Sequence, residues 1–126
     1  MFWIFKKKKV VPHVRLTGII GSAGRFKQGM DLYSQQEILK KAFSFKKAKH
    51  VAISINSPGG SPVQSHLIYS YIRQLAEETN TKVIIFAEDV AASGGYFIAC
   101  AGDEIYANSS SIIGSIGVIY SSFGFT

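Results

Sequence analysis

The amino-acid sequence predicts a parallel α/β domain built from repeated strand–turn–helix units. Two short apolar runs rich in β-branched residues, 51–55 and 83–87, are typical of strands buried inside a sheet. Each run leads through a turn of small residues into a segment with the apolar pattern of a helix. Because such turns gather at the carboxyl ends of parallel strands, we expect both turns to lie at one edge of the sheet.

The first turn, residues 56–60, reads Asn-Ser-Pro-Gly-Gly and precedes a predicted helix. Pro62 suits the first helical position and Ser61 suits the cap. We predict that the turn brings the unhindered backbone N–H groups of Gly59 and Gly60 close to the second turn. The apolar face of the helix is expected to consist of Val63, Leu67, Ile68, Tyr71, Ile72 and Leu75.

The second turn presents Ser93 between two alanines and two glycines. Small neighbours leave room for another molecule, and the start of the following helix supplies free N–H donors and a positive dipole end. A nucleophile beside preorganised donors is what acyl transfer requires. The alternative is that Ser93 merely caps the helix. The nucleophile pattern Gly-x-Ser-x-Gly is only half matched, since Ala91 stands at its first glycine.

Three further segments complete the predicted domain. Residues 13–20 and 104–107 have the patterns of strands, and residues 112–120 are apolar with glycines that allow backbones to approach closely. Residues 96–101, which follow Ser93, are apolar on nearly every side, which favours a helix buried in the core or in a subunit interface. The single cysteine, Cys100, is expected to be an inert core thiol.

A helix is also predicted between the first two strands. Ser34 followed by Glu37 three residues later is a capping-box pattern, with an apolar face expected from Ile38, Leu39, Ala42 and Phe43. Lysines follow at its far end, where they complement the negative pole of the helix. We interpret these as a solvated end: Lys40, Lys41, Lys46, Lys47 and Lys49.

Three motifs in order resemble the signal peptide peptidase family of serine proteases (the protease IV or S49 type). They are the turn 56–60, Ala-Ala-Ser-Gly-Gly-Tyr at 91–96 and Gly-Ser-Ile-Gly-Val at 114–118. The resemblance runs from about residue 10 to the last residue, although Ser109 to Ser111 stand where the family usually has a proline. We therefore expect a basic aromatic tail at 1–9 and an incomplete peptidase domain at 10–126.

The resemblance implies a Clp-protease/crotonase-like fold, a Ser–Lys dyad and a homo-oligomeric assembly. Ser93 would be the nucleophile, and the N–H groups of Gly60 and Gly94, beside Gly59, would form the oxyanion hole. The implied substrates are cleaved signal peptides or other membrane-derived peptides with small or apolar side chains. Neither a cofactor nor a metal is expected.

The sequence shows no evident general base. His13 and His50 precede strands and His66 lies within a helix, so we expect all three on the surface. Lys82 begins the strand that leads to Ser93, and five residues at about 3.3 Å each place it roughly 16 Å or more away. The family's lysine lies further along the chain than residue 126. We therefore expect this chain to be truncated and inactive by itself.

The positive charge is concentrated at the start of the chain, within a net charge of +6. The lysines form short clusters without an aromatic reading surface, which argues against nucleic-acid binding. Residues 1–5 are apolar and aromatic but far shorter than the roughly 20 residues of a membrane-spanning helix, and no signal peptide is evident. The following cluster, Lys6, Lys7, Lys8 and Lys9, is either a contact with an anionic membrane surface or a solvated tail.

Two other functions remain open at this point. The chain could be an inactive truncated or assembly subunit. It could instead be a crotonase-like acyl-CoA enzyme, which would use similar glycine donors but would not need Ser93.

Overall fold

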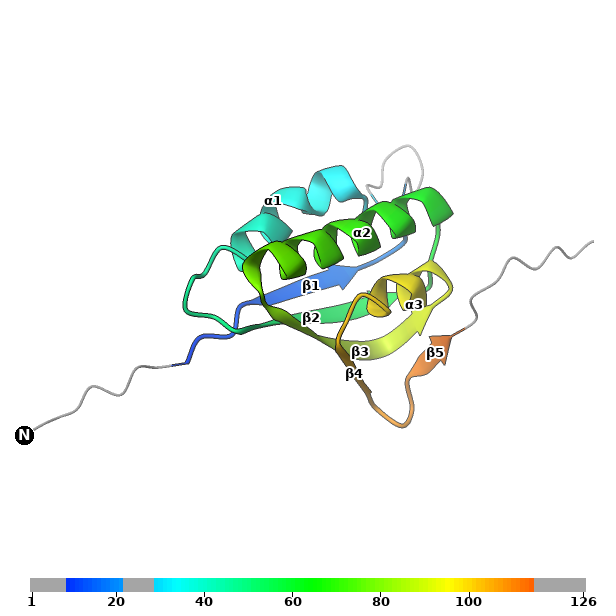
Figure 1. Ribbon diagram of the computed structural model, residues 1–126. Coiled ribbons are helices and arrows are strands. Elements are labelled where there is room, and N and C mark those ends of the chain that lie inside the picture. The colour runs from blue at the N-terminus through cyan, green and yellow to red at the C-terminus, as the bar shows by residue number, and fades with distance from the viewer. Residues whose placement is uncertain (1–8, 22–28, 115–126) are drawn as a thin grey trace, which may run out of the picture.

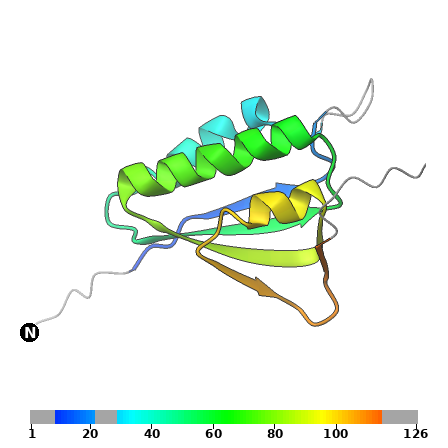
Figure 2. The ribbon, with the colours of Figure 1, turned by 45° about the vertical axis from the view of Figure 1, so that its right-hand side comes forward.

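The computed structural model describes residues 9–21 and 29–114, which form an all-parallel sheet with helices on one face (Figures 1 and 2). The order of the main strands is β1-β2-β3-β4, and β5 pairs with the end of β3. The strands are β1 (His13–Thr17), β2 (His50–Ser57), β3 (Lys82–Ala92), β4 (Glu104–Ala107) and β5 (Ile112–Gly114). The helices are α1 (Leu32–Ala42), α2 (Pro62–Thr79) and α3 (Gly94–Ala99). The predicted parallel α/β class is confirmed.

The core lies between the sheet and the helices. Because side chains alternate along a strand, every second residue of the central strands points toward the helices. Those residues are branched and fully buried, among them Ile53, Ile55, Val83 and Ile85 at 0% exposure. The predicted apolar runs therefore do form the central strands of the sheet.

β3 is longer than the apolar run 83–87 predicts, since it continues to Ala92. The extension pairs with β5, from Val90 opposite Ile112 to Ala92 opposite Gly114. The residues of this extension carry no strong strand pattern. Pairing with β5, which comes later in the chain, therefore extends the strand. As a result, β3 runs without interruption into Ser93.

α2 begins as predicted, with Pro62 first and the Ser61 hydroxyl accepting a hydrogen bond from the Gln64 N–H at 3.1 Å. Its predicted apolar face is partly wrong, because Val63 is 66% and Leu67 39% exposed. The buried stripe consists of Ser65, Ile68, Ile72, Leu75 and Ala76. Gly94 approaches this stripe closely, since a Cβ atom on Gly94 would lie 2.2 Å from the Ser65 Oγ.

α1 begins two residues before Ser34, and its cap is Asp31. The Asp31 carboxylate accepts from the Ser34 N–H at 2.8 Å and the Ser34 Oγ accepts from the Asp31 N–H at 3.2 Å. This reciprocal pair is a capping box with serine in the third position, so the expected cap at Ser34 was wrong. Leu39, Ala42 and Phe43 are buried as predicted, whereas Ile38 is 52% exposed.

α3 is buried on one side only, so the alternative of a helix enclosed in the core is wrong, while burial in a subunit interface stays a prediction. Ile98 and Ala99 are buried, while Phe97 is half-buried against Tyr69 of α2, with ring centroids 5.0 Å apart. Cys100 is exposed, so the prediction of a core thiol was wrong. The chain therefore reaches solvent just after the last turn of α3, at Cys100.

Three predictions fall outside the described residues. They concern Lys6 to Lys8 of the basic tail, the loop after Gly21, and the apolar stretch beyond Gly114. The lysines around the end of α1 are exposed, in agreement with a solvated end.

Candidate active site

Ser93 occupies the turn between β3 and α3 in a strained backbone conformation. Its φ is 53° and its ψ is −121°, a region that residues with a Cβ atom rarely adopt. The main chain holds this conformation: the Ser93 N–H donates to the Gly114 carbonyl at 2.7 Å, and the Ser93 carbonyl accepts from the Phe97 N–H at 3.0 Å. The side chain makes no capping hydrogen bond, so Ser93 is not a plain cap.

This conformation is of the kind that sharp nucleophile turns impose, although the matching sequence pattern is incomplete. Ala91 stands at its first glycine and is fully buried. The second glycine is present as Gly95, where a Cβ atom would lie 2.6 Å from the Ser57 carbonyl oxygen. The close approach of two chain segments therefore requires glycine at 95, while β3 accommodates alanine at 91.

The two small-residue turns meet at Ser93, as the sequence predicts. Gly59 has a φ of 108°, and a Cβ atom on it would lie 2.8 Å from the Ser93 Cβ and 3.0 Å from the Gly94 N. Only a residue without a side chain fits between these groups. The glycine turn after β2 is thus packed directly against the serine turn after β3.

Gly60 and Gly94 leave backbone donors available. Gly60 forms a parallel bridge with Ile20, in which the Ser61 N–H donates to the Ile20 carbonyl at 2.8 Å and the Ile20 N–H donates to the Gly59 carbonyl at 2.9 Å. In such a bridge the N–H of the middle residue, Gly60, points away from the partner strand. Within the described part of the chain, neither this N–H nor that of Gly94, in the first turn of α3, donates to an acceptor.

Two further polar residues support the site, and the sequence analysis did not single out their side chains. The Ser57 side chain is fully buried, and its Oγ accepts from the Gly59 N–H at 3.1 Å. The Asn56 Oδ1 accepts from the Val90 N–H at 3.2 Å. Both belong to the Asn-Ser-Pro-Gly-Gly turn, so their place in that motif was the available signal.

None of the candidate bases considered from the sequence hydrogen-bonds to Ser93 in the described structure. Lys82 begins the eleven-residue β3 and Ser93 follows its end, which at about 3.3 Å per residue separates them by roughly 36 Å along the strand. The His13 ring is 2.6 Å from the Ser54 Oγ, on the sheet. His50 and His66 are exposed, and His66 lies against Phe97 with ring centroids 5.9 Å apart.

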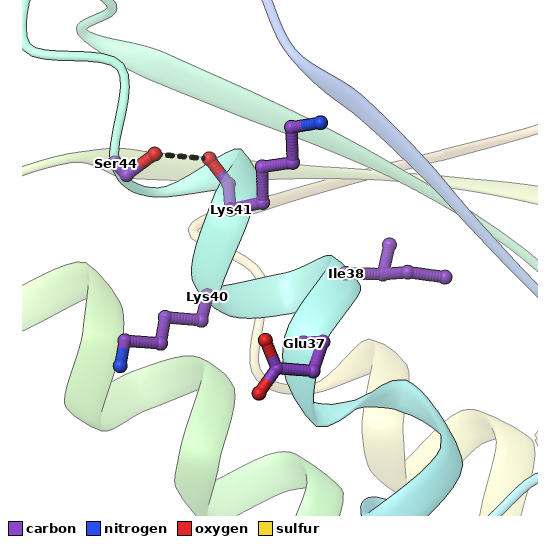
Figure 3. A pocket seen from close by; sticks show the side chains of 5 residues that line it. All are labelled: Glu37, Ile38, Lys40, Lys41 and Ser44. Atoms are coloured by element: carbon purple, nitrogen blue, oxygen red, sulfur yellow. Dashed lines mark hydrogen bonds between the residues drawn. The ribbon is translucent and has the colours of Figure 1, made fainter.

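A hollow near the end of α1, of about 440 Å³, does not resemble a catalytic centre (Figure 3). The side chains of Lys40 and Lys41 diverge, and the Ser44 hydroxyl is engaged with the Lys41 carbonyl at 2.6 Å. A groove of about 390 Å³ lies nearer the site, beside β3, and is lined by Ala87, Glu88, Asp89, Asn108, Ser110, Ser111 and Ile112. Across the two described ranges, no three His, Cys, Asp or Glu side chains are grouped to hold a metal ion.

The electrostatics beside this groove are set by an ion pair. Arg15 of β1 reaches over β2 and donates to both carboxylate oxygens of Glu88, at 2.9 and 2.7 Å. The hydrogen bond from Arg15 lowers the pKa of Glu88 and raises that of Arg15. Glu88 is therefore a charged, paired carboxylate, which does not favour a role as a proton acceptor.

Comparison with known proteins finds similarity to peptidases. Residues 76–126 match the family described as Peptidase family S49. The chain is 41% identical over 87 residues to the chloroplastic serine protease SPPA of Arabidopsis thaliana, covering 69% of this chain and 13% of that protein. It is 37% identical over 111 residues to Protease 4 of Haemophilus influenzae, covering 88% of this chain and 18% of that protein.

A higher identity is found with a protein of a different name. Over 116 residues the chain is 60% identical to a protein named Na(+)/H(+) antiporter NhaA from Brucella melitensis, covering 91% of this chain but 16% of that protein. The chain thus spans less than a fifth of each of these three relatives. None of the helices in the described residues has the length and apolar character to cross a membrane.

A solved structure confirms the fold. The membrane-bound stomatin-specific protease 1510-N, in a mutant form, superposes with a TM-score of 0.68 at 24% sequence identity, covering 95% of this chain and 55% of that one. Together with the all-parallel sheet and its strand–turn–helix units, this agrees with the predicted Clp-protease-like fold.

Proposed function

Since the chain belongs to peptidase family S49, we propose that it carries the nucleophile of a serine endopeptidase, and that this nucleophile is Ser93. The observation that carries the proposal is the strained turn at Ser93, whose φ is 53° and whose side chain makes no capping bond. Strain of this kind persists only where the surroundings impose it, and it concentrates at functional sites. A serine used only for packing or capping would gain nothing from this conformation.

The proposed reaction is acyl transfer. The Ser93 Oγ forms a bond to the carbonyl carbon of the substrate while its proton passes to a base. The carbonyl π electrons move onto oxygen, and the N–H groups of Gly60 and Gly94 donate to this oxyanion. The tetrahedral intermediate then collapses, the C–N bond breaks, and the amine leaves with a proton from the protonated base. Water attacks the acyl-serine by the same route and releases the acid.

The proposed base is the lysine of the Ser–Lys dyad that the resemblance implies. Such a lysine must be desolvated so that its amine is neutral at the working pH. Lys82 does not fit, since it is exposed and lies at the opposite end of β3 from Ser93. The resemblance places this lysine later in the chain than residue 126, so we propose that residues 1–126 alone hydrolyse peptides at a barely detectable rate.

The proposed substrates are peptides with small or apolar side chains, derived from signal peptides or membrane proteins. The resemblance to the signal peptide peptidase family implies this class, and the words "membrane-bound" for the solved structure agree with it. A homo-oligomer and a contact of the basic tail, Lys6 to Lys9, with a membrane surface are part of the same proposal.

The test uses the intact protein, meaning residues 1–126 joined to the segment that supplies the proposed lysine, and compares it with its Ser93→Ala variant on an apolar fluorogenic peptide. We expect a loss of activity of about a thousandfold or more, because no other group replaces a nucleophile. Ser109→Ala is the matched control, since Ser109 lies in an exposed loop and should leave the rate unchanged.

Two other outcomes would contradict the proposal. Full activity of the Ser93→Ala variant would favour the acyl-CoA enzyme. A folded wild-type protein without hydrolysis, and without labelling of Ser93 by a fluorophosphonate, would favour an inactive subunit.

A further inference from the structure

The strand that carries Ser93 changes its pairing register just before it reaches the site. β2 and β3 pair residue for residue from His50 opposite Lys82 to Ile55 opposite Ala87. The next pair is Ser57 opposite Ala91. One residue of β2, Asn56, thus faces the three residues of β3 that lie between Ala87 and Ala91. Such a bulge leaves main-chain groups of β3 without a main-chain partner on β2.

The Asn56 side chain fills this gap. Its Oδ1 accepts from the Val90 N–H at 3.2 Å, in place of the carbonyl that a regular ladder would supply. The main-chain carbonyl of Asn56 accepts from the Gly18 N–H at 3.0 Å and so remains tied to the end of β1. Asn56 therefore joins β1, β2 and β3 at the point where β3 departs from the regular register.

We propose that Asn56 is a positioning residue, whose side-chain amide sets the register at which β3 delivers Ser93 against Gly59. The inference rests on the proposed function of Ser93. Val90 lies only three residues before Ser93, about 10 Å along a strand. A slip of one residue would shift the serine by about 3.3 Å and turn alternate side chains to the other face.

The two ends of this short segment are held by different elements. Asn56 holds Val90 from the β2 side, and the Gly114 carbonyl of β5 holds the Ser93 N–H at 2.7 Å. Because β5 also pairs with Val90 to Ala92, loss of the Asn56 amide should leave the segment in the sheet. The expected effect is therefore a misplaced serine in a folded protein, and not an unfolded one.

The experiment uses the intact protein and three variants. Asn56→Leu keeps the size of the side chain and removes the acceptor, whereas Asn56→Asp keeps an acceptor oxygen. Ser54→Ala is the matched control, because it removes a hydrogen bond to His13 from the same face of the same strand. The readouts are hydrogen exchange of the Val90 amide, kcat and KM on an apolar fluorogenic peptide, and the melting temperature.

We expect Asn56→Leu to speed exchange at Val90 by tenfold or more and to lower kcat by about 10- to 100-fold with little change in KM, since displacements of about 1 Å cost this much. Asn56→Asp should recover most of the Val90 protection and most of kcat, and Ser54→Ala should change neither quantity. A purely structural role would lower the melting temperature of both Asn56→Leu and Ser54→Ala, and the two variants would not differ in kcat or in Val90 exchange.

A folded Asn56→Leu variant with wild-type kcat would overturn the inference. If that variant does not fold, the wild type and Asn56→Asp decide: an unprotected Val90 amide in either protein would also overturn it. A wild-type protein without Ser93-dependent hydrolysis would instead refute the proposed function, and the role of Asn56 with it.

Discussion

Ser93 and Gly59 occupy a space in which each restricts the other. Ser93 carries a Cβ atom at a positive φ, and Gly59 has none because the Ser93 Cβ takes that room. The Ser93 Cβ therefore lies directly against the Gly59 backbone, with no side chain at position 59 between them. At this scale the candidate site consists of backbone geometry around the proposed nucleophile.

The Gly59→Ala substitution should destabilise the protein and remove the reactivity of Ser93. Gly59 has a φ of 108°, and a Cβ atom added to it would lie 2.8 Å from the Ser93 Cβ, so an added methyl group meets both strain and a steric clash. We expect a loss of more than about 2 kcal/mol in the free energy of unfolding. Urea unfolding and the rate of fluorophosphonate labelling of Ser93 measure the two effects.

Gly18→Ala is the matched control for this substitution. Gly18 has a similar φ of 99° but nothing within 4 Å of an added Cβ atom. Because of backbone strain alone, the Gly18→Ala variant should lose about 1–2 kcal/mol in the free energy of unfolding, and it should keep the labelling rate of Ser93. Equal labelling of the Gly59→Ala and Gly18→Ala variants would show that Gly59 and Ser93 do not share the site.

At the scale of elements, the strands are tied by side chains as well as by the ladder. The Arg15–Glu88 pair connects β1 to β3 over β2, and the hydrogen bond from Arg15 lowers the pKa of Glu88. A carboxylate whose pKa is lower in the folded state stabilises the fold above its unfolded-state pKa. That contribution disappears as the pH falls through the folded-state value.

We therefore expect Glu88→Gln to lower the free energy of unfolding slightly at pH 7 and to leave it unchanged in acid, below the folded-state pKa of Glu88. The effect should be small and should weaken in high salt, because the pair is exposed to solvent. Urea unfolding across the acidic range measures it. Asp89→Asn, at a neighbouring exposed carboxylate, is the control. The same pH dependence in both variants would contradict a specific role of the pair.

At the scale of the whole molecule, the residues that the structure describes cover the sheet on one face only. All-parallel sheets normally have both faces buried, yet in the described residues the three helices lie on the same side (Figure 2). The other face carries Phe86, 42% exposed, stacked on Tyr106, 52% exposed, with ring centroids 5.6 Å apart. α3 lies on the covered face, where it packs on α2 and β3, so it exposes less apolar surface than its sequence indicates.

The open face should promote self-association of the 126-residue chain. We expect Phe86→Lys to lower the apparent mass in sedimentation or size-exclusion experiments, since it places a charge within the aromatic pair. Tyr33→Lys is the control, because Tyr33 of α1 is 89% exposed. If both variants behave like the wild type, the open face does not mediate association.

Much of the fold could be predicted because its signals are local. The branched runs of β2 and β3, the Ser61–Pro62 start of α2 and the two small-residue turns each depend on a few neighbouring residues. The rule that such turns gather at the carboxyl ends of parallel strands then predicts that Gly59 lies near Ser93. The roles proposed for Ser93, Gly60 and Gly94 came from the resemblance and remain predictions.

What only the tertiary structure decided depends on partners distant in the sequence. β5 extends β3 to Ala92, and its Gly114 carbonyl helps to hold Ser93 at a positive φ. The bulge opposite Asn56 arises from pairing between strands more than thirty residues apart. Which residues of an amphipathic helix are buried likewise depends on the neighbour, so that Ser65 lies inside against Gly94 while Val63 faces solvent. Local patterns contain the propensity of each element, but the positions of its neighbours determine its length, its register and its buried face.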